Sequence, residues 1–170
     1  MSISSVRKRA AKPPAEVRGL DETRWLDVQD GLFRLHTQQG WATLVDDPTA
    51  SDGRAARMGG EHRQWAVSLP LSEDLNPGNP WRVYATARCD ATATEGKAMT
   101  MGIYNGAAKK SVTGRTYYVP QLAGSEYRVL DLGTHELSGG MYFWAAPPER
   151  PGEVQHVYVD RVFLIRQSKP

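Results

Sequence analysis

The stretch Val157-Tyr158-Val159-Asp160-Arg161-Val162-Phe163-Leu164, near the C-terminal end of the chain, carries most of the prediction of the fold. Apolar residues occupy both of its alternating faces, as expected of a strand in the middle of a sheet that is covered on both sides. Asp160 is the exception. Because burying an unpaired carboxylate is costly, the sequence predicts that Asp160 has a partner, either an arginine or a metal ion.

A second long segment, Trp81–Cys89, alternates with a period of two. Its odd positions are Trp81, Val83, Ala85, Ala87 and Cys89. The intervening side chains include Arg82 and Tyr84. This pattern predicts a strand with one buried face and one face toward solvent or a ligand.

The rest of the chain consists of short apolar stretches separated by turn residues. Clusters such as Asn76-Pro77-Gly78-Asn79-Pro80 and Asn105-Gly106 mark the turns, and no long helical stripe or internal repeat occurs. Many short strands with glycine and proline between them are typical of an antiparallel sandwich or barrel. The sequence therefore predicts an all-β fold, an antiparallel β-sandwich.

Length and composition exclude several classes of protein. The chain has 170 residues, which suits one domain with a core of ordinary size. The single Cys89 cannot form an intramolecular disulfide, and no Cys/His cluster has zinc-site spacing. No apolar run approaches the roughly 20 residues of a membrane-spanning helix, so no membrane span is predicted.

The positive charge is concentrated at the N-terminus. The net charge is +2, and residues 1–14 contain four basic side chains and no acidic one, so the remainder is slightly acidic. A nucleic-acid-binding domain is expected to carry its basic patch on the fold itself, so no nucleic acid is predicted as a partner. We expect a flexible basic linker over 1–19, a β-sandwich module over 20–167 and a short tail over 168–170.

Three sequence pieces occur together and in a fixed order. They are Asp27–Gly31 at the start of the fold, Val45–Ala56 in an early loop, and Val157–Leu164 at its end. This arrangement resembles the jelly-roll carbohydrate-binding modules with a galactose-binding-like fold, over residues 25–166. The resemblance implies a jelly roll in which the first and last strands pair.

In that family the three pieces hold a structural calcium ion. Carried over residue by residue, the resemblance implies a calcium site formed by Asp27, Gln29, Asp52 and Asp160, with backbone carbonyls of the 51–54 loop. Calcium prefers six to eight oxygen ligands, so the residue types are suitable. The sequence departs from the family pattern at Gln29, which replaces an acid, and at Asp52, which replaces glycine. Fewer charged ligands predict weaker calcium binding, unless Asp52 or Asp30 turns inward. The alternative is that Asp160 pairs with an arginine and Asp27 is solvated.

Sugar binding by such modules requires exposed aromatic rings that stack on pyranose faces, with polar groups that bind hydroxyls. Most aromatic residues of a sandwich belong to its core, and Trp65 and Trp81 are assigned to the core by alternation. The candidates for a binding face are Tyr104, Trp144, Tyr118, Arg82 and Tyr84. The sequence does not distinguish a sheet face from a loop edge as the location.

No pattern of catalytic residues is recognisable. The four histidines are scattered, and the chain has no nucleophile elbow, P-loop or dinucleotide fingerprint. Some jelly-roll domains are lyases or hydrolases, and in that case Tyr117, His135 and Arg115 are the residues of interest. The expectation is nevertheless that the protein is not an enzyme.

The resemblance therefore implies a non-catalytic carbohydrate-binding module that binds a polysaccharide or oligosaccharide. It also implies neighbouring domains in a larger secreted protein, with an extracellular or periplasmic location. Two alternatives remain: a structural accessory domain that packs on a catalytic module without binding glycan, and a jelly-roll polysaccharide lyase or hydrolase. The glycan and the oligomeric state are not predicted.

Overall fold

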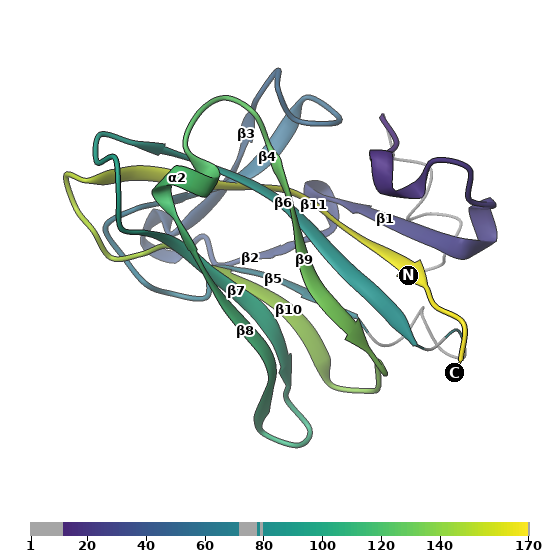
Figure 1. Ribbon diagram of the computed structural model, residues 1–170. Helices are drawn as coiled ribbons and strands as arrows, with labels where there is room; N and C mark the ends of the chain where they lie inside the picture. Colours follow the sequence, from purple (N-terminus) through teal and green to yellow (C-terminus); the bar gives the residue numbers. More distant parts are fainter. Residues whose placement is uncertain (1–11, 72–77, 79, 170) are drawn as a thin grey trace.

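The computed structural model describes residues 12–71, 78 and 80–169. Two β-sheets face one another in a sandwich (Figure 1). The strands are β1 Trp25–Gln29, β2 Arg34–Leu35, β3 Ala42–Asp46, β4 Arg54–Gly59, β5 Val67–Pro70, β6 Trp81–Ala91, β7 Lys97–Asn105, β8 Lys110–Tyr118, β9 Arg128–His135, β10 Met141–Ala146 and β11 Val154–Arg166. The helices are short: the α-helix α2 Val119–Leu122 and the 3-10 helices Ala15–Val17, Glu22–Arg24, Asp30–Leu32 and Gln38–Gly40. Within these described residues, none of the helices has the length and apolar character needed to cross a membrane.

The strands pair as in a jelly roll. One sheet has the order β3-β4-β11-β6-β9, with β1 added against β11, and the other has the order β2-β5-β10-β7-β8. All ladders between these strands are antiparallel, and the first strand β1 pairs with the last strand β11. The prediction of an antiparallel jelly-roll β-sandwich is confirmed.

The core lies between the sheets, and the alternation of β6 supplies one wall of it. Trp81, Val83, Ala85, Ala87 and Cys89 are all buried in the main hydrophobic cluster, as predicted. The opposite wall comes from the same period-two pattern in β7 and β10, whose inward residues include Met99, Met101, Ile103, Met141 and Phe143.

Strand β11 contains a β-bulge at Asp160. Val159 pairs with Ala87 of β6 and Arg161 pairs with Thr86, so Asp160 is the extra residue on its strand. A bulge shifts the alternation by one residue. The side chains that face the core therefore have odd residue numbers just before Asp160 and even residue numbers after it. Uninterrupted alternation over 157–164 would instead place Arg161 on the same face as Val159.

On the edge of β11 that faces away from β6, the partner strand changes at the bulge. Before Asp160, residues 156–159 pair with β4, and after it, residues 161–165 pair with β1. β1 and β4 therefore follow one another along the same edge of β11. The first strand and the loop before β4 meet at the bulge, and this meeting point positions the acidic cluster described below.

The outer face of the six-stranded sheet is partly covered by the chain that precedes β1. Val17 is buried together with Trp25, Phe163 and Ile165. An Arg161 side-chain nitrogen also donates a hydrogen bond to the carbonyl of Lys12. From Lys12 onward, the segment expected to be a linker thus packs on the sandwich, while residues 1–11 of that expected linker lie outside the described residues.

Candidate functional site

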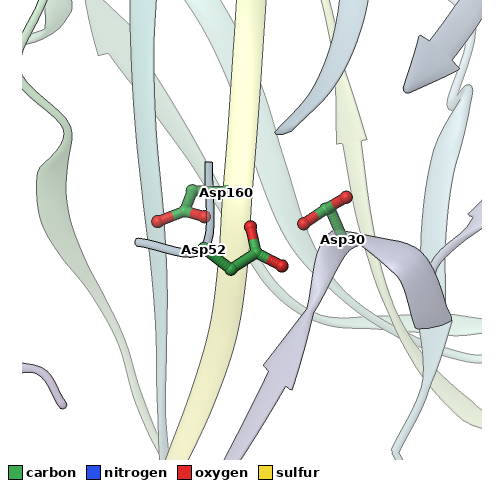
Figure 2. A group of neighbouring side chains, drawn as sticks. All are labelled: Asp30, Asp52 and Asp160. Carbon is green, nitrogen blue, oxygen red and sulfur yellow. The ribbon is translucent and has the colours of Figure 1, made fainter. Parts of the chain in front are cut away.

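Three aspartates gather around the bulge of β11 (Figure 2). Asp160 comes from the bulge itself, Asp52 from the loop between β3 and β4, and Asp30 from the 3-10 turn that follows β1 directly. One carboxylate oxygen from each lies within 4.8 Å of the others. Asp30 and Asp160 are buried, and Asp52 lies on the solvent side.

The hydrogen bonds of this cluster do not satisfy its carboxylates. Ser51 donates from its backbone nitrogen to Asp160 Oδ2 at 3.0 Å, and its hydroxyl lies 3.0 Å from Asp160 Oδ1. Asp30 Oδ1, by contrast, is buried and has no hydrogen-bond partner among the described residues. A buried acceptor without a donor is destabilising unless a ligand completes it.

The pKa values of two carboxylates in the cluster are raised above the ordinary value. Burial, together with the neighbouring charges of Asp52 and Asp160, raises the pKa of Asp30 to about 7. Burial raises the pKa of Asp160 to about 6, even though the hydrogen bonds from Ser51 oppose this shift. Three carboxylates held this close favour either protonation or a bound cation.

The residues fit a hard divalent cation such as calcium. The donors are carboxylate oxygens, which calcium prefers, and one of them is buried without a partner. They come from three separate parts of the chain, so an ion bound to them would connect the end of β1, the β3–β4 loop and β11.

Of the four residues implied as calcium ligands, the structure brings Asp52 and Asp160 into this cluster. Asp27 instead accepts hydrogen bonds on its Oδ2 from the Gln29 side-chain amide at 2.9 Å and from Arg161 at 3.3 Å, while its Oδ1 is buried without a hydrogen-bond partner among the described residues. It is fully buried, so the alternative of a solvated Asp27 is wrong. The Gln29 side-chain oxygen lies 3.1 Å from the Ser51 hydroxyl, at the margin of the cluster.

Another buried carboxylate, Asp47, lies in the β3–β4 loop that also carries Asp52. Both of its oxygens accept hydrogen bonds. Arg88 donates two hydrogen bonds to its Oδ2, at 2.9 and 3.1 Å, and the Tyr127 hydroxyl donates a third at 2.7 Å. Thr49 donates to the other oxygen. Burial alone would raise the pKa of Asp47, but these donors outweigh it and hold the pKa at about 2.

The five-stranded sheet carries an aromatic cluster on its outer face. Trp65, from the loop before β5, stacks on Trp144 of β10 with ring centroids 4.1 Å apart and planes within 5°. Tyr104 of β7 meets Trp65 edge-on at 5.7 Å, and Tyr142 of β10 lies 5.7 Å from Tyr104. Trp144 is buried beneath Trp65, which is 41% exposed. The outermost ring is thus held in place by those below it.

Glycine 102 allows this stacking. Gly102 pairs with Trp144 across the β7–β10 ladder, and a Cβ atom at Gly102 would lie 3.0 Å from the Trp144 ring and 2.2 Å from a backbone oxygen of Thr113. Only glycine leaves room for the indole to lie over the strand. The aromatic cluster therefore depends on a small residue in the neighbouring strand.

Two hollows flank Trp65. One, of about 430 Å³, is lined by Arg34, His36, Trp65, Ser68, Pro70, Gly140, Met141 and Tyr142. The other, of about 500 Å³, is lined by His36, Trp41, Arg63, Gln64 and Trp65. Both combine aromatic surface with hydrogen-bond donors, a combination typical of sugar-binding sites.

Of the five sequence-predicted sugar-binding candidates, the structure brings Tyr104 and Trp144 into this aromatic cluster. Tyr118 is 50% exposed but lies at the Lys97 end of β7, whereas Tyr104 lies at the opposite end. Arg82 and Tyr84 belong to β6 of the other sheet. There, Arg82 is paired with Asp131.

Sequence analysis missed Trp65 and Tyr142, and it named Asp30 only as a residue that could turn inward toward the calcium site. The sequence suggested a strand from Gln64 and therefore a buried Trp65, but β5 begins only at Val67, so Trp65 lies in a loop and is exposed. Tyr142 could have been found from its spacing, since it is two residues from Trp144 in one strand and shares its face.

The three enzyme candidates named from sequence lie on two strands, Arg115 and Tyr117 on β8 and His135 on β9. Tyr117 is buried, and the His135 Nε2 atom lies 2.6 Å from the carbonyl oxygen of Leu132. Tyr117, His135 and Arg115 are not among the residues that line the hollows beside Trp65.

Comparison with known proteins shows the fold. No protein-family model matches the chain, and no curated protein matches it in sequence. Among solved structures, it is similar to the family 35 carbohydrate-binding module from Clostridium thermocellum, with a TM-score of 0.53 and 14% identity over 82% of this chain and 97% of the module.

Two larger enzymes contain a similar domain. The CBM22-1–GH10 modules of Clostridium thermocellum endo-1,4-β-D-xylanase 10B, in complex with xylohexaose, match with a TM-score of 0.53 and 9% identity over 84% of this chain. The Podospora anserina GH26-CBM35 β-(1,4)-mannanase matches with a TM-score of 0.54 and 10% identity over 86% of this chain. The chain spans only 27% and 28% of these two structures.

Proposed function

We propose that this chain is a non-catalytic carbohydrate-binding module that binds a glycan on the outer face of its five-stranded sheet, with Trp65 as the central contact. The observation that carries the proposal is the ring stack of Trp65 on Trp144, bordered by Tyr104 and Tyr142. Solved structures with the same fold include carbohydrate-binding modules, which agrees with this role.

The physical basis is a flat, preformed apolar surface. The exposed part of the Trp65 ring can take up the C–H face of a pyranose, which gains from stacking and from the release of water. Because the stack already fixes Trp65, little side-chain freedom is lost when a sugar binds. Around the rings, Arg34, His36 and Ser68 offer hydrogen-bonding groups for hydroxyls.

The character of the hollows supports a binding role over hydrolysis. Glycoside hydrolysis commonly uses a pair of carboxylic acids on either side of the scissile bond. Among the described residues, neither hollow beside Trp65 is lined by an aspartate or glutamate. We therefore infer that the module binds its glycan without cleaving it.

The acidic cluster has a separate, structural role in this proposal. Asp30, Asp52 and Asp160 would hold a calcium ion, and the ion would supply positive charge that three adjacent carboxylates lack. The effect is to connect the first strand, the β3–β4 loop and the last strand. Binding to the folded state alone stabilises it by mass action.

The wider context of the module is part of the same proposal. Two of the similar structures combine such a domain with a catalytic module, so we infer that the chain acts beside other domains of a glycan-degrading protein. This inference places it outside the cell or in the periplasm, where such substrates are encountered.

Titration against a panel of soluble plant, algal and host polysaccharides, with calcium present, tests the binding role. We expect saturable binding that Trp65→Ala weakens at least about tenfold, because the substitution removes the stacking surface. Tyr118→Ala is the matched control, since it removes an exposed aromatic ring of the same sheet outside the cluster. No binding across the panel, or equal binding by Trp65→Ala and the wild type, would overturn the proposal.

A further inference from the structure

We propose that the glycan bound at Trp65 is anionic, and that the Arg34 guanidinium binds its carboxylate or sulfate groups. This inference rests on the proposed function and specifies the class of glycan. It is carried by the arginines of the two hollows, whose described lining residues include no aspartate or glutamate.

Arg34 lies at one edge of the five-stranded sheet, beside the aromatic stack. It belongs to β2, the outermost strand, and pairs with Ser68 of β5, which in turn pairs with Trp144 of β10. Arg34 thus lies on the same transverse row of the sheet as Trp144. Its side chain is exposed and lines the hollow that Trp65 and Tyr142 also line.

The guanidinium of Arg34 has no hydrogen-bond or ion-pair partner within the described part of the chain. Other arginines of the fold are neutralised locally: Arg88 pairs with Asp47 at 2.9 Å, and Arg150 pairs with Glu153 at 3.0 Å. An exposed arginine retains its charge at all physiological pH values. Arg34 is therefore available to an external anion.

The second hollow adds another positive group. Arg63 lies 3.6 Å from Glu149, but the two side chains are 76% and 52% exposed, so their attraction is weak and screened by solvent. A ligand anion could compete for Arg63 at little cost. The two arginines line two hollows that both border Trp65, where charged substituents along a glycan chain would meet them.

Arginine and tryptophan make complementary contributions in such a site. The indole binds the apolar face of a sugar ring regardless of its charge, whereas the planar guanidinium binds a carboxylate or sulfate through paired hydrogen bonds. A neutral glycan would gain only the stacking. Selectivity for acidic sugars would therefore depend on Arg34, and affinity for any sugar on Trp65.

Two matched pairs of probes test the inference by isothermal titration calorimetry. Polygalacturonate oligosaccharides are compared with the same oligosaccharides after reduction of their carboxyl groups, and κ-carrageenan oligosaccharides with their desulfated forms. We expect at least about tenfold tighter binding of the charged member in one or both pairs, with a preference that falls as salt rises. The pair that shows the preference identifies the anion.

Arg34→Gln is expected to remove most of this preference while leaving the binding of the neutral probe within about twofold. Arg18→Gln is the charge-matched control, because Arg18 is also exposed but lies on the segment that covers the other sheet. We expect Arg18→Gln to retain the preference. A preference lost equally in both variants would indicate general electrostatic attraction and overturn the role of Arg34.

The outcomes separate this inference from the proposed function. Equal binding of charged and neutral probes, weakened by Trp65→Ala, would overturn the anionic preference and leave the carbohydrate-binding role in place. Absence of binding to every probe, neutral or charged, would overturn both.

Discussion

Two groups of buried acids in this fold have opposite electrostatic environments. Asp47 receives hydrogen bonds from Arg88, Tyr127 and Thr49, which hold its pKa at about 2. Asp30 and Asp160, at the bulge of β11, have pKa values raised by burial to about 7 and about 6. Both groups tie the β3–β4 loop to the six-stranded sheet.

The difference lies in where the compensating charge comes from. The Asp47 group contains its own cation in Arg88, whose side chain also lies 3.8 Å from the ring of Tyr158. The acidic cluster of Asp30, Asp52 and Asp160 has no hydrogen-bonded cation among the described residues. One group therefore contains its own counter-charge, while the other is the site that we propose a cation from solution completes.

The largest effect is expected from removing the internal cation. Arg88→Met leaves the buried Asp47 carboxylate without its positively charged partner. Breaking such a buried ion pair typically costs about 3–5 kcal/mol of folding stability. Urea unfolding monitored by tryptophan fluorescence measures the loss. We expect the same loss with calcium and with EDTA, because this group needs no external ion. A loss under 1 kcal/mol would show that Asp47 is solvated in the folded protein.

The second effect concerns the external cation. Calcium at about 100 times its dissociation constant is expected to stabilise the wild type by about 2.7 kcal/mol, seen as a higher Tm. Asp160→Ala should abolish that shift and also destabilise the domain. Asp30→Asn should reduce the shift strongly, although Asp30 was not among the ligands expected from sequence.

Asp27→Asn distinguishes the two possible ligand sets. In the structure Asp27 is bonded to Gln29 and Arg161, so its substitution is expected to leave the calcium-induced Tm shift in place. Loss of the shift in Asp27→Asn with retention in Asp30→Asn would restore the ligand set implied by the resemblance. An unchanged shift in Asp160→Ala would sink the calcium assignment altogether.

The third and smallest effect is a pH dependence of opposite sign in the two groups. The pKa of Asp47 is lower in the folded than in the unfolded chain, so its contribution, roughly 2 kcal/mol, is present above pH 4 and lost toward pH 2. Asp30 and Asp160 have raised pKa values, so without calcium the protein gains stability as the pH falls from about 7 to about 4.

Urea titrations from pH 8 to pH 2, with EDTA, measure this profile. We expect a maximum of stability near pH 4, between the two opposing effects. Tyr127→Phe removes one donor to Asp47 and should lessen the loss on the acid side only. A profile that falls steadily from pH 7 downward would contradict the raised pKa values of the cluster.

The fold was predictable because its signals are local and repeated. The alternation of residues 81–89 predicted the buried face of β6, and all five predicted inward residues lie in the core. Asp160 was recognised as a polar residue in an apolar strand that requires a partner. The pairing of the first and last strands followed from the resemblance and is present in the structure.

The site was less predictable because it depends on where strands end and shift. The bulge at Asp160 coincides with a change of partner strand from β4 to β1, which is a tertiary property. Asp30 joins the cluster only because β1 ends at Gln29 and the chain turns there. Trp65 is exposed for a similar reason, since β5 begins two residues after it.

The pairing of β1 with β11 also determines how the module responds to tension. Trp25, at the start of β1, lies opposite Ile165, near the end of β11, so both strands lead out of the fold at the same end. Pulling them apart loads the ladder one hydrogen bond at a time, from Trp25 toward Gln29, rather than all of its bonds in parallel. The acidic cluster lies at the far end of that ladder. An ion bound there would resist further separation of the two strands, because it would hold three segments of the chain together at that point.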